Sequence, residues 1–309
     1  MKITKVMRTK LRFIISVIVI PAKAGIQIIK AGFPGRPEKS SRAGRVKPGM
    51  TDVRAFLTQH TGFVRIFILT LIIFFPVSLP ALEMPTDEEV AADPTVLFKC
   101  FETAHESMAD YETILTKKEI LRGRDYPEEK MLVKYKKPMK IRLEWVGPVN
   151  RGMWGIYDSQ VDEKHFWAQD VGWRGKFGVL RFGLHSIFID VFHPNRFTAS
   201  ACYIKGLIGI VRENFELAKK LGKTSMKYMG RVKAPVAGVE AYFVHADLSP
   251  DPKDGLVCAS ADLYLDAHTC MAVNATIYGW KGEMIGRYVY TDIHPNIGIP
   301  DEVFKIPGR

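Results

Sequence analysis

The sequence lacks every common catalytic and cofactor motif. It has no G-x-S-x-G nucleophile turn, no H-E-x-x-H zinc pair, no P-loop and no dinucleotide-binding glycine fingerprint. Its histidines show no metal-ligand spacing, because there is no H-x-H and no pair four residues apart. The acids Glu128, Glu129, Asp251 and Asp254 fall in turn-like polar stretches, where solvated carboxylates are expected. We therefore predict no enzyme, no metal and no cofactor; a carboxylate pair for glycoside hydrolysis is the weaker alternative, since spacing across a sheet is invisible in sequence.

Cysteine is scarce, with four residues at positions 100, 202, 258 and 270. The absence of C-x-x-C speaks against a zinc ribbon and a thioredoxin-type site. An even count permits disulfides in an oxidising compartment, and four cysteines allow three pairings. Nothing in the sequence chooses among these pairings, and buried free thiols are an equal alternative.

Acidic residues are almost missing from the first sixty positions. Residues 1–60 hold 13 Lys and Arg against only Glu38 and Asp52, so this segment carries the entire net charge of +11. A chain beginning at Leu82 has 30 basic and 31 acidic residues, which is close to neutral. The excess positive charge therefore gives no support to nucleic-acid binding by residues 82–309. A role of residues 1–60 as a basic arm that contacts phosphates is a minor alternative.

Apolar runs long enough to span a bilayer are also absent, and of the two short runs, within 11–20 and 66–75, the second has the character of an export signal. Residues 1–49 are rich in Gly and Pro and resemble, in part, translated intergenic repeat DNA, so we interpret them as a non-native or disordered leader and Met50 as a possible start. Residues 50–81 combine Arg54 and Arg65, the run 66–75 (IFILTLIIFF) and small residues up to Ala81. The run is short for a bilayer span, which favours a secretory signal cleaved near Ala81 over a membrane anchor.

The remaining body, residues 82–309, is predicted to be a single α+β domain. A helix is expected from Thr86 to about Asp110, with Pro94 restarting it, and a second from Ile204 to about Ala218, which Gly222 ends. Between and after them, period-two alternation predicts short strands at 111–121, 130–136, 139–145, 152–157, 227–232, 239–248, 261–265, 271–279 and 284–292. Residues 166–192 are read as strand and loop of uncertain pairing. The absence of a βαβ rhythm indicates one antiparallel sheet curled around the helices.

Three short stretches resemble a known family. They are Tyr135, Lys136, Lys137 and Pro138 followed by 140–145 (KIRLEW); 279–283 (GWKGE) followed by 287–292 (RYVYTD); and Asn296, Ile299 and 301–304 (DEVF). This layout is similar to the periplasmic outer-membrane lipoprotein carriers of the LolA/LolB type, and still closer to a related family of uncharacterised exported bacterial proteins. The resemblance implies an unclosed β-barrel whose helices cover its concave face and an apolar cavity that holds acyl chains.

The resemblance also suggests which residues bind a ligand. On two strands of the predicted sheet, apolar side chains that alternate with polar ones are the candidates for the cavity lining: Ile141, Leu143, Trp145, Val273, Ala275 and Ile277. The same residues equally suit a filled core. Lys136, Lys137 and Pro138 stand on the carrier-motif strand, where Lys137 replaces the usual arginine; because Arg and Lys differ in bidentate bonding, this departure favours a different ligand.

The sequence therefore predicts a periplasmic, non-catalytic binding protein for lipid or lipidated-protein cargo. Its partners would be a lipid or acylated lipoprotein, together with a protein of the inner or outer membrane, and no nucleic acid. The alternative is a structural or interaction module of the cell envelope that binds a protein partner through its sheet.

Overall fold

The structure is a computed structural model that describes residues 83–184, 195–198 and 201–307. The predicted leader, residues 1–49, and the predicted export signal, residues 50–81, lie outside the described residues. The fold below therefore concerns the body of the chain alone.

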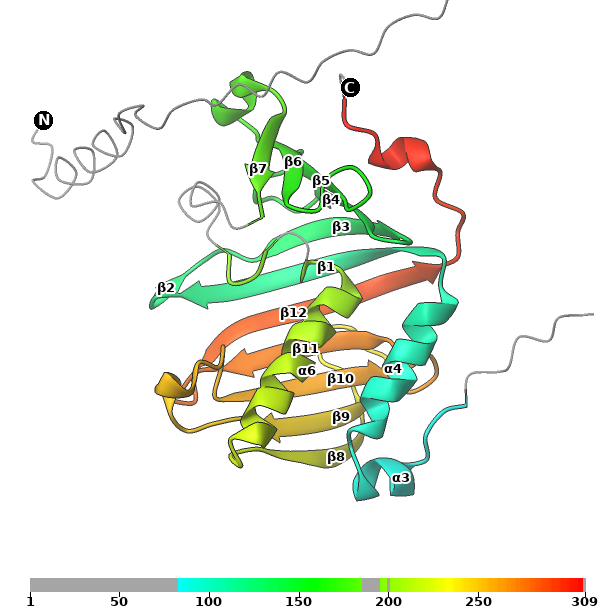
Figure 1. Cartoon of the computed structure of the whole chain (residues 1–309), viewed down its shortest axis with the longest axis vertical. Coiled ribbons are helices and arrows are strands. Elements are labelled where there is room, and N and C mark those ends of the chain that lie inside the picture. Colours follow the sequence, from blue (N-terminus) through cyan, green and yellow to red (C-terminus); the bar gives the residue numbers. More distant parts are fainter. Residues whose placement is uncertain (1–82, 185–194, 199–200, 308–309) are drawn as a thin grey trace, which may run out of the picture. The chain divides into compact units, whose positions relative to one another are not determined.

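One antiparallel sheet of twelve strands organises the described residues (Figure 1). Its strands are β1 (Asp110–Leu121), β2 (Arg124–Asp125), β3 (Glu129–Lys136), β4 (Lys140–Trp145), β5 (Trp154–Asp158), β6 (His165–Gln169), β7 (Leu180–Gly183), β8 (Ser225–Lys233), β9 (Glu240–Asp247), β10 (Ser260–Asp266), β11 (Ala272–Tyr278) and β12 (Met284–Pro295). The predicted strands are all present, with small changes at their ends.

The sheet consists of two meanders joined through β1. The strand order is β7-β6-β5-β4-β3-β1-β12-β11-β10-β9-β8, with β2 paired only to β1. Because β1 lies between β3 and β12, the first and last long strands of the chain are neighbours, and β7 and β8 form the two ends of the path. The sheet is therefore an unclosed, curled half-barrel, which confirms the predicted α+β class.

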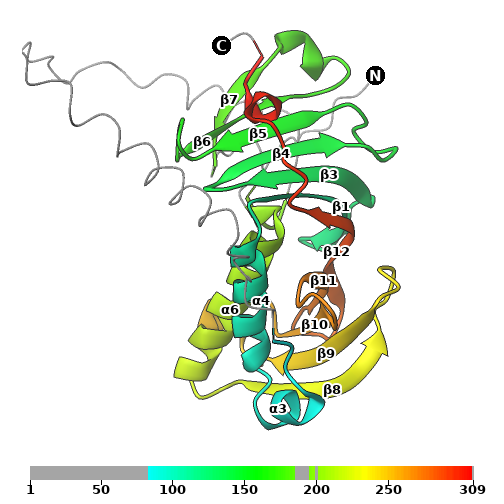
Figure 2. The ribbon, with the colours of Figure 1, turned by 90° about the vertical axis from the view of Figure 1, so that its right-hand side faces the viewer.

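Three helices of the described residues cover one face of this sheet (Figures 1 and 2). They are α3 (Asp87–Ala92), α4 (Val96–Ser107) and α6 (Ile204–Lys220). At the start of α3 the Thr86 hydroxyl accepts from the Glu89 amide while the Glu89 carboxylate accepts from the Thr86 amide, a capping box. The predicted first helix is interrupted at Asp93 and Pro94, because proline cannot continue an α-helix.

The hydrophobic core lies between these helices and the concave face of the sheet. Leu97 and Phe101 of α4 and Leu207 and Phe215 of α6 belong to one buried cluster with residues of β1, β3, β4 and β9–β12. A smaller cluster on the other face joins Ala234, Ala241, Tyr264 and Val273. The helices thus bury one side of the sheet, and the polar residues that alternate with the core residues occupy the other.

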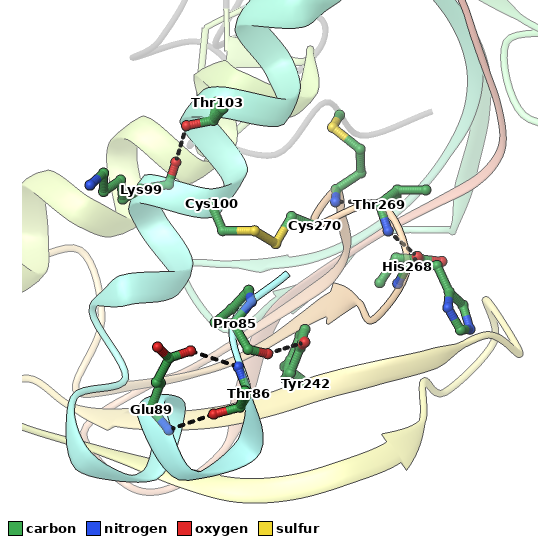
Figure 3. The surroundings of a disulfide bond; sticks show 12 residues. Pro85, Thr86, Glu89, Lys99, Cys100, Thr103, Tyr242, His268, Thr269 and Cys270 are labelled. Atoms are coloured by element: carbon green, nitrogen blue, oxygen red, sulfur yellow. Dashed lines mark hydrogen bonds between the residues drawn. A yellow bond between two sulfur atoms is a disulfide. The ribbon is translucent and has the colours of Figure 1, made fainter. Parts of the chain in front are cut away.

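A disulfide ties the first long helix to the sheet (Figure 3). Cys100 of α4 is bonded to Cys270 in the turn between β10 and β11, 170 residues further along the chain. Cys202 and Cys258 are free thiols. The structure therefore selects one pairing where the sequence left three, because only the fold brings the Cys100 and Cys270 Cα atoms to 5.9 Å.

Candidate functional site

An apolar cavity of about 270 Å³ opens in the half of the sheet that carries β3 to β7. Its volume is near the lower end of ligand pockets, roughly 300–1,000 Å³. The lining is mostly aromatic and aliphatic: Met131, Leu143, Trp145, Met153, Trp154, Phe166, Ala168, Trp173, Phe177, Leu180, Phe182 and Phe197. Gly155 of β5 also lines it, and Lys117, Asp170, Arg174, Asn195 and Cys202 complete the wall.

The inner wall of the cavity contains a buried ion pair. Lys117 of β1 and Glu129 of β3 lie directly opposite each other in the strand register, and the Lys117 Nζ is 2.7 Å from the Glu129 Oε2. Lys117 also donates to Asn195, and the Glu129 Oε1 accepts from the Trp145 indole and the Asn150 amide, each at 3.0 Å. Burial opposes ionisation, yet the two carboxylates near Lys117 outweigh it and raise the pKa of this lysine. The pKa of Glu129 is lowered, because the Lys117 ammonium and these donors outweigh the effect of burial.

Glu119 extends this charged cluster beneath the cavity. Its carboxylate lies 3.8 Å from the Lys117 ammonium and accepts from the Tyr288 hydroxyl and the Arg196 amide. The Arg196 guanidinium donates to the carbonyls of Ile120 and Ile285. Two cations and two carboxylates therefore balance, so the charges at the inner end of the cavity are compensated internally.

The sequence missed this cluster, although a signal for it was present. In β1 the inward positions are Tyr111, Thr113 and Leu115, and the same period of two carries on to Lys117 and Glu119. Two charged residues, Lys117 and Glu119, on the inward-facing side of a predicted strand indicate buried ion pairing. The expectation that Glu129 is a solvated turn residue was wrong, because this residue begins β3 and its side chain is only 16% exposed.

The structure separates the six residues predicted to line a cavity. Leu143 and Trp145 line the one described above, whereas Ile141 is buried in the main core. Ala275 and Ile277 of β11 also belong to the main core, at positions that do not border this cavity. Val273 lies in the smaller cluster on the other face, because the pairing of β10 with β11 shifts register next to it.

Lys136 of the carrier motif holds the C-terminal segment, and none of the motif residues Lys136, Lys137 and Pro138 borders the cavity. Lys136 donates to the Ile299 carbonyl at 2.7 Å and pairs with Asp301 at 3.0 Å. Lys137 donates to the Glu106 carbonyl at the end of α4, and its bond to Pro138 is cis. The short 3-10 helix η4 (Asp301–Phe304) is thereby fixed beside β4, with Phe304 buried.

A buried histidine lies in the main core, away from the cavity. His105 of α4 is 1% exposed, and neither ring nitrogen has a hydrogen-bond partner among the described residues. Its ring contacts Phe101, Tyr111, Tyr135 and Tyr203. Burial, aided by Lys205 and Lys137, lowers the pKa of His105 to about 4.

Neither a metal cluster nor a membrane-spanning helix occurs in the described part of the chain. No group of three or more His, Cys, Asp or Glu side chains in 83–184, 195–198 and 201–307 is placed to hold a metal ion. Within those same ranges, no helix is long and apolar enough to cross a bilayer.

The fold and the site thus define a class of α+β protein, an unclosed antiparallel half-barrel with helices on one face and an apolar cavity in its β3–β7 half. Its residues 108–307 match the family described as protein of unknown function DUF1571, and the chain belongs to that family. No curated protein matches the chain.

Several solved structures are similar to this chain at low identity. An uncharacterised conserved protein from Thermus thermophilus is 10% identical, with a TM-score of 0.41, covering 70% of this chain and 94% of its own. A LolA superfamily protein from Nitrosomonas europaea is 10% identical, with a TM-score of 0.28 and coverages of 67% and 96%. The Mycobacterium tuberculosis lipoprotein LppX is 10% identical, with a TM-score of 0.38 and coverages of 67% and 98%.

Proposed function

We propose that the protein binds a lipid, or the acyl chain of a lipidated protein, in the cavity between β3 and β7. The observation that carries this proposal is the cavity itself, whose wall is aromatic and aliphatic except for Lys117, Asp170, Arg174, Asn195 and Cys202. The charges among them are paired, Lys117 with Glu129 and Arg174 with Asp170. Burying each methylene of an acyl chain in such a cavity is worth about 0.8 kcal/mol, so apolar lining alone supplies affinity.

The same proposal places the protein in the periplasm, exported by the signal predicted in residues 50–81. The Cys100–Cys270 disulfide supports this placement, because disulfides persist in oxidising compartments. Binding, and no catalysis, is the proposed activity: the buried charges near the cavity are paired with one another, and burial raises the pKa of the one free thiol among the described lining residues, Cys202, to about 11, which keeps it protonated.

The test compares two glycine-to-leucine variants of protein isolated from the periplasm. In Gly155→Leu the new Cβ meets the Trp167 carbonyl at 3.7 Å and the Phe166 ring at 3.8 Å, ordinary contacts, so the side chain fills the cavity without backbone strain. Gly209→Leu is the matched control, because Gly209 lies on α6 outside the cavity with open space around it.

The readouts are native mass spectrometry of the purified protein and binding of the fluorescent probe N-phenyl-1-naphthylamine. Gly155→Leu should lose co-purifying lipid and bind the probe about tenfold more weakly, whereas Gly209→Leu should match the wild type. A wild-type protein that carries no lipid and binds no probe would refute the proposal. Recovery of one stable protein partner without lipid would favour the envelope interaction module.

A further inference from the structure

We propose that residues 171–184, which connect β6 to β7 and include β7, form a docking tip that seats the cavity mouth on an anionic bilayer surface. This inference rests on the proposed function and adds the surface from which the ligand is exchanged. The tip contains the 3-10 helix η1 (Arg174–Phe177) and lies at the β7 end of the sheet (Figures 1 and 2).

Three large apolar side chains of the docking tip face solvent. Trp173 is 63% exposed, Phe177 66% and Leu180 40%, and the Trp173 and Phe177 rings meet edge to face at 6.2 Å. Single exposed apolar residues are ordinary on a protein surface, but two aromatic rings and a leucine within eight positions form a patch. Such a patch indicates a contact with an apolar phase.

The charge of the docking tip is of one sign. Residues 171–184 contain Arg174, Lys176 and Arg181 and no Asp or Glu, in a body that is otherwise near neutral. Asp170 and Asp162, which precede the tip, pair with Arg174 and Arg181. Lys176 is exposed and forms no ion pair with any residue that the structure describes, so its charge is available to a phosphate-bearing surface.

The size of the docking tip favours a bilayer over a protein partner. A stable protein interface uses about 20–30 residues on each side, and this tip exposes a few large side chains on a short turn. A bilayer interface accepts single Trp and Phe side chains at the headgroup level and attracts adjacent Lys and Arg to anionic lipids. The mixture of exposed aromatic and basic residues on the docking tip therefore matches a bilayer interface.

The docking tip is also the opening of the cavity. Trp173, Phe177 and Leu180 border the cavity while remaining exposed on their other side. Insertion of these side chains into the headgroup region would bring the cavity opening against acyl chains. A lipid would then enter or leave without exposing its apolar part to water.

Vesicle co-sedimentation tests the proposal, with protein isolated from the periplasm. Vesicles of phosphatidylcholine with 30% phosphatidylglycerol (roughly the anionic charge that attracts basic segments) are compared with pure phosphatidylcholine. We expect the wild type to bind the anionic vesicles, and Trp173→Ala with Phe177→Ala to lower the bound fraction about tenfold. Lys176→Glu should lower it about fivefold and reduce its salt dependence.

The control variants carry the same changes elsewhere on the surface. Met229→Ala and Val236→Ala remove side chains that are 53% and 63% exposed outside the tip, and Lys227→Glu reverses an exposed charge on β8. All three should bind vesicles as the wild type does. Equal binding of the tip variants and these controls would overturn the proposal, as would a wild type that binds neither vesicle.

Lys176→Glu separates the two proposals, because Lys176 does not border the cavity. This variant should keep wild-type binding of N-phenyl-1-naphthylamine while losing vesicle binding. Probe binding by a wild type that ignores vesicles would refute the docking tip alone. Vesicle binding by a wild type that carries no lipid and takes no probe would refute the proposed cavity function. Tip variants that lose one protein partner with vesicle binding unchanged would show a protein-docking surface instead.

Discussion

The Lys117 ammonium lies 2.7 Å from the Glu129 carboxylate at the inner wall of the apolar cavity, on directly opposed positions of β1 and β3. The side chains are only 8% and 16% exposed. A buried pair contributes little net stability, but removing one partner leaves an unpaired charge in a poorly solvated place. The pair therefore fixes the register of two central strands more than it strengthens the fold.

Lys117→Met should lower the free energy of unfolding by about 3–5 kcal/mol, because Glu129 and Glu119 lose their common cation. Urea denaturation measures this change. Arg287→Met is the control: Arg287 pairs with Glu128 at 3.0 Å between side chains that are 35% and 48% exposed, so its loss should cost about 1 kcal/mol or less. Equal effects of the two variants would contradict a buried role for Lys117.

Removal of the Cys100–Cys270 disulfide should destabilise the protein strongly. The bond closes a loop of 170 residues, and restricting the unfolded chain to this extent is worth up to about 5 kcal/mol in the chain-entropy model. The paired Cys100→Ala and Cys270→Ala variant should melt at lower temperature and be insensitive to dithiothreitol. Cys258→Ala should keep the dithiothreitol sensitivity of the wild type, and a peptide map that joins Cys100 to Cys202 or to Cys258 would contradict this assignment.

His105 should make the fold acid-sensitive. Burial lowers the pKa of this histidine to about 4, below its value of about 6.5 in an unfolded chain, so the unfolded state binds the proton more tightly. Stability is thus unaffected by this group above pH 6.5 and falls as the pH drops toward 4, by a total of about 3 kcal/mol.

The His105→Phe variant isolates this effect, since other groups also titrate at low pH. Its free energy of unfolding, measured with urea at pH 7, 5 and 4 (roughly spanning the two pKa values), should fall less with acid than that of the wild type. His268→Phe is the control at a histidine that is 74% exposed, and its pH profile should follow the wild type. Parallel profiles for His105→Phe and the wild type would rule out the buried neutral histidine.

Asp110 should hold the C-terminal segment on the sheet. Its buried carboxylate accepts from the amides of Gly298 and Ile299, each at 3.1 Å, while the Asn296 side chain accepts from the Ala109 amide at 2.7 Å. Asp110→Ala leaves two amides without a partner, at a cost of about 1–3 kcal/mol each where they stay buried. Hydrogen exchange should accelerate in residues 298–304, whereas Asp125→Ala, at an exposed carboxylate, should leave this segment protected.

Local sequence patterns predicted the positions of the helices and strands better than they predicted the cavity and its lining. The helix start at Thr86, the apolar spacing from Ile204 to Ala218 and the alternation in residues 140–145 each act over a few residues, so they were visible in the sequence. The cavity was not visible, because alternation marks the side chains that point inward and says nothing about whether they meet. Leu143 and Trp145 border the cavity, whereas Ile141, on the same strand face, is packed in the core.

By itself, the sequence determined the antiparallel α+β class, the order of helices and strands and the location of the excess positive charge in residues 1–60. Only the tertiary structure decided that Cys100 pairs with Cys270, that Val273 leaves the face of Ala275, and that Lys117 and Glu129 meet beside the cavity. The physical reason is the separation along the chain over which each interaction acts: backbone periodicity and helix capping depend on residues that are close in sequence. A disulfide, a register shift and a buried ion pair depend on which distant segments the folded sheet brings together.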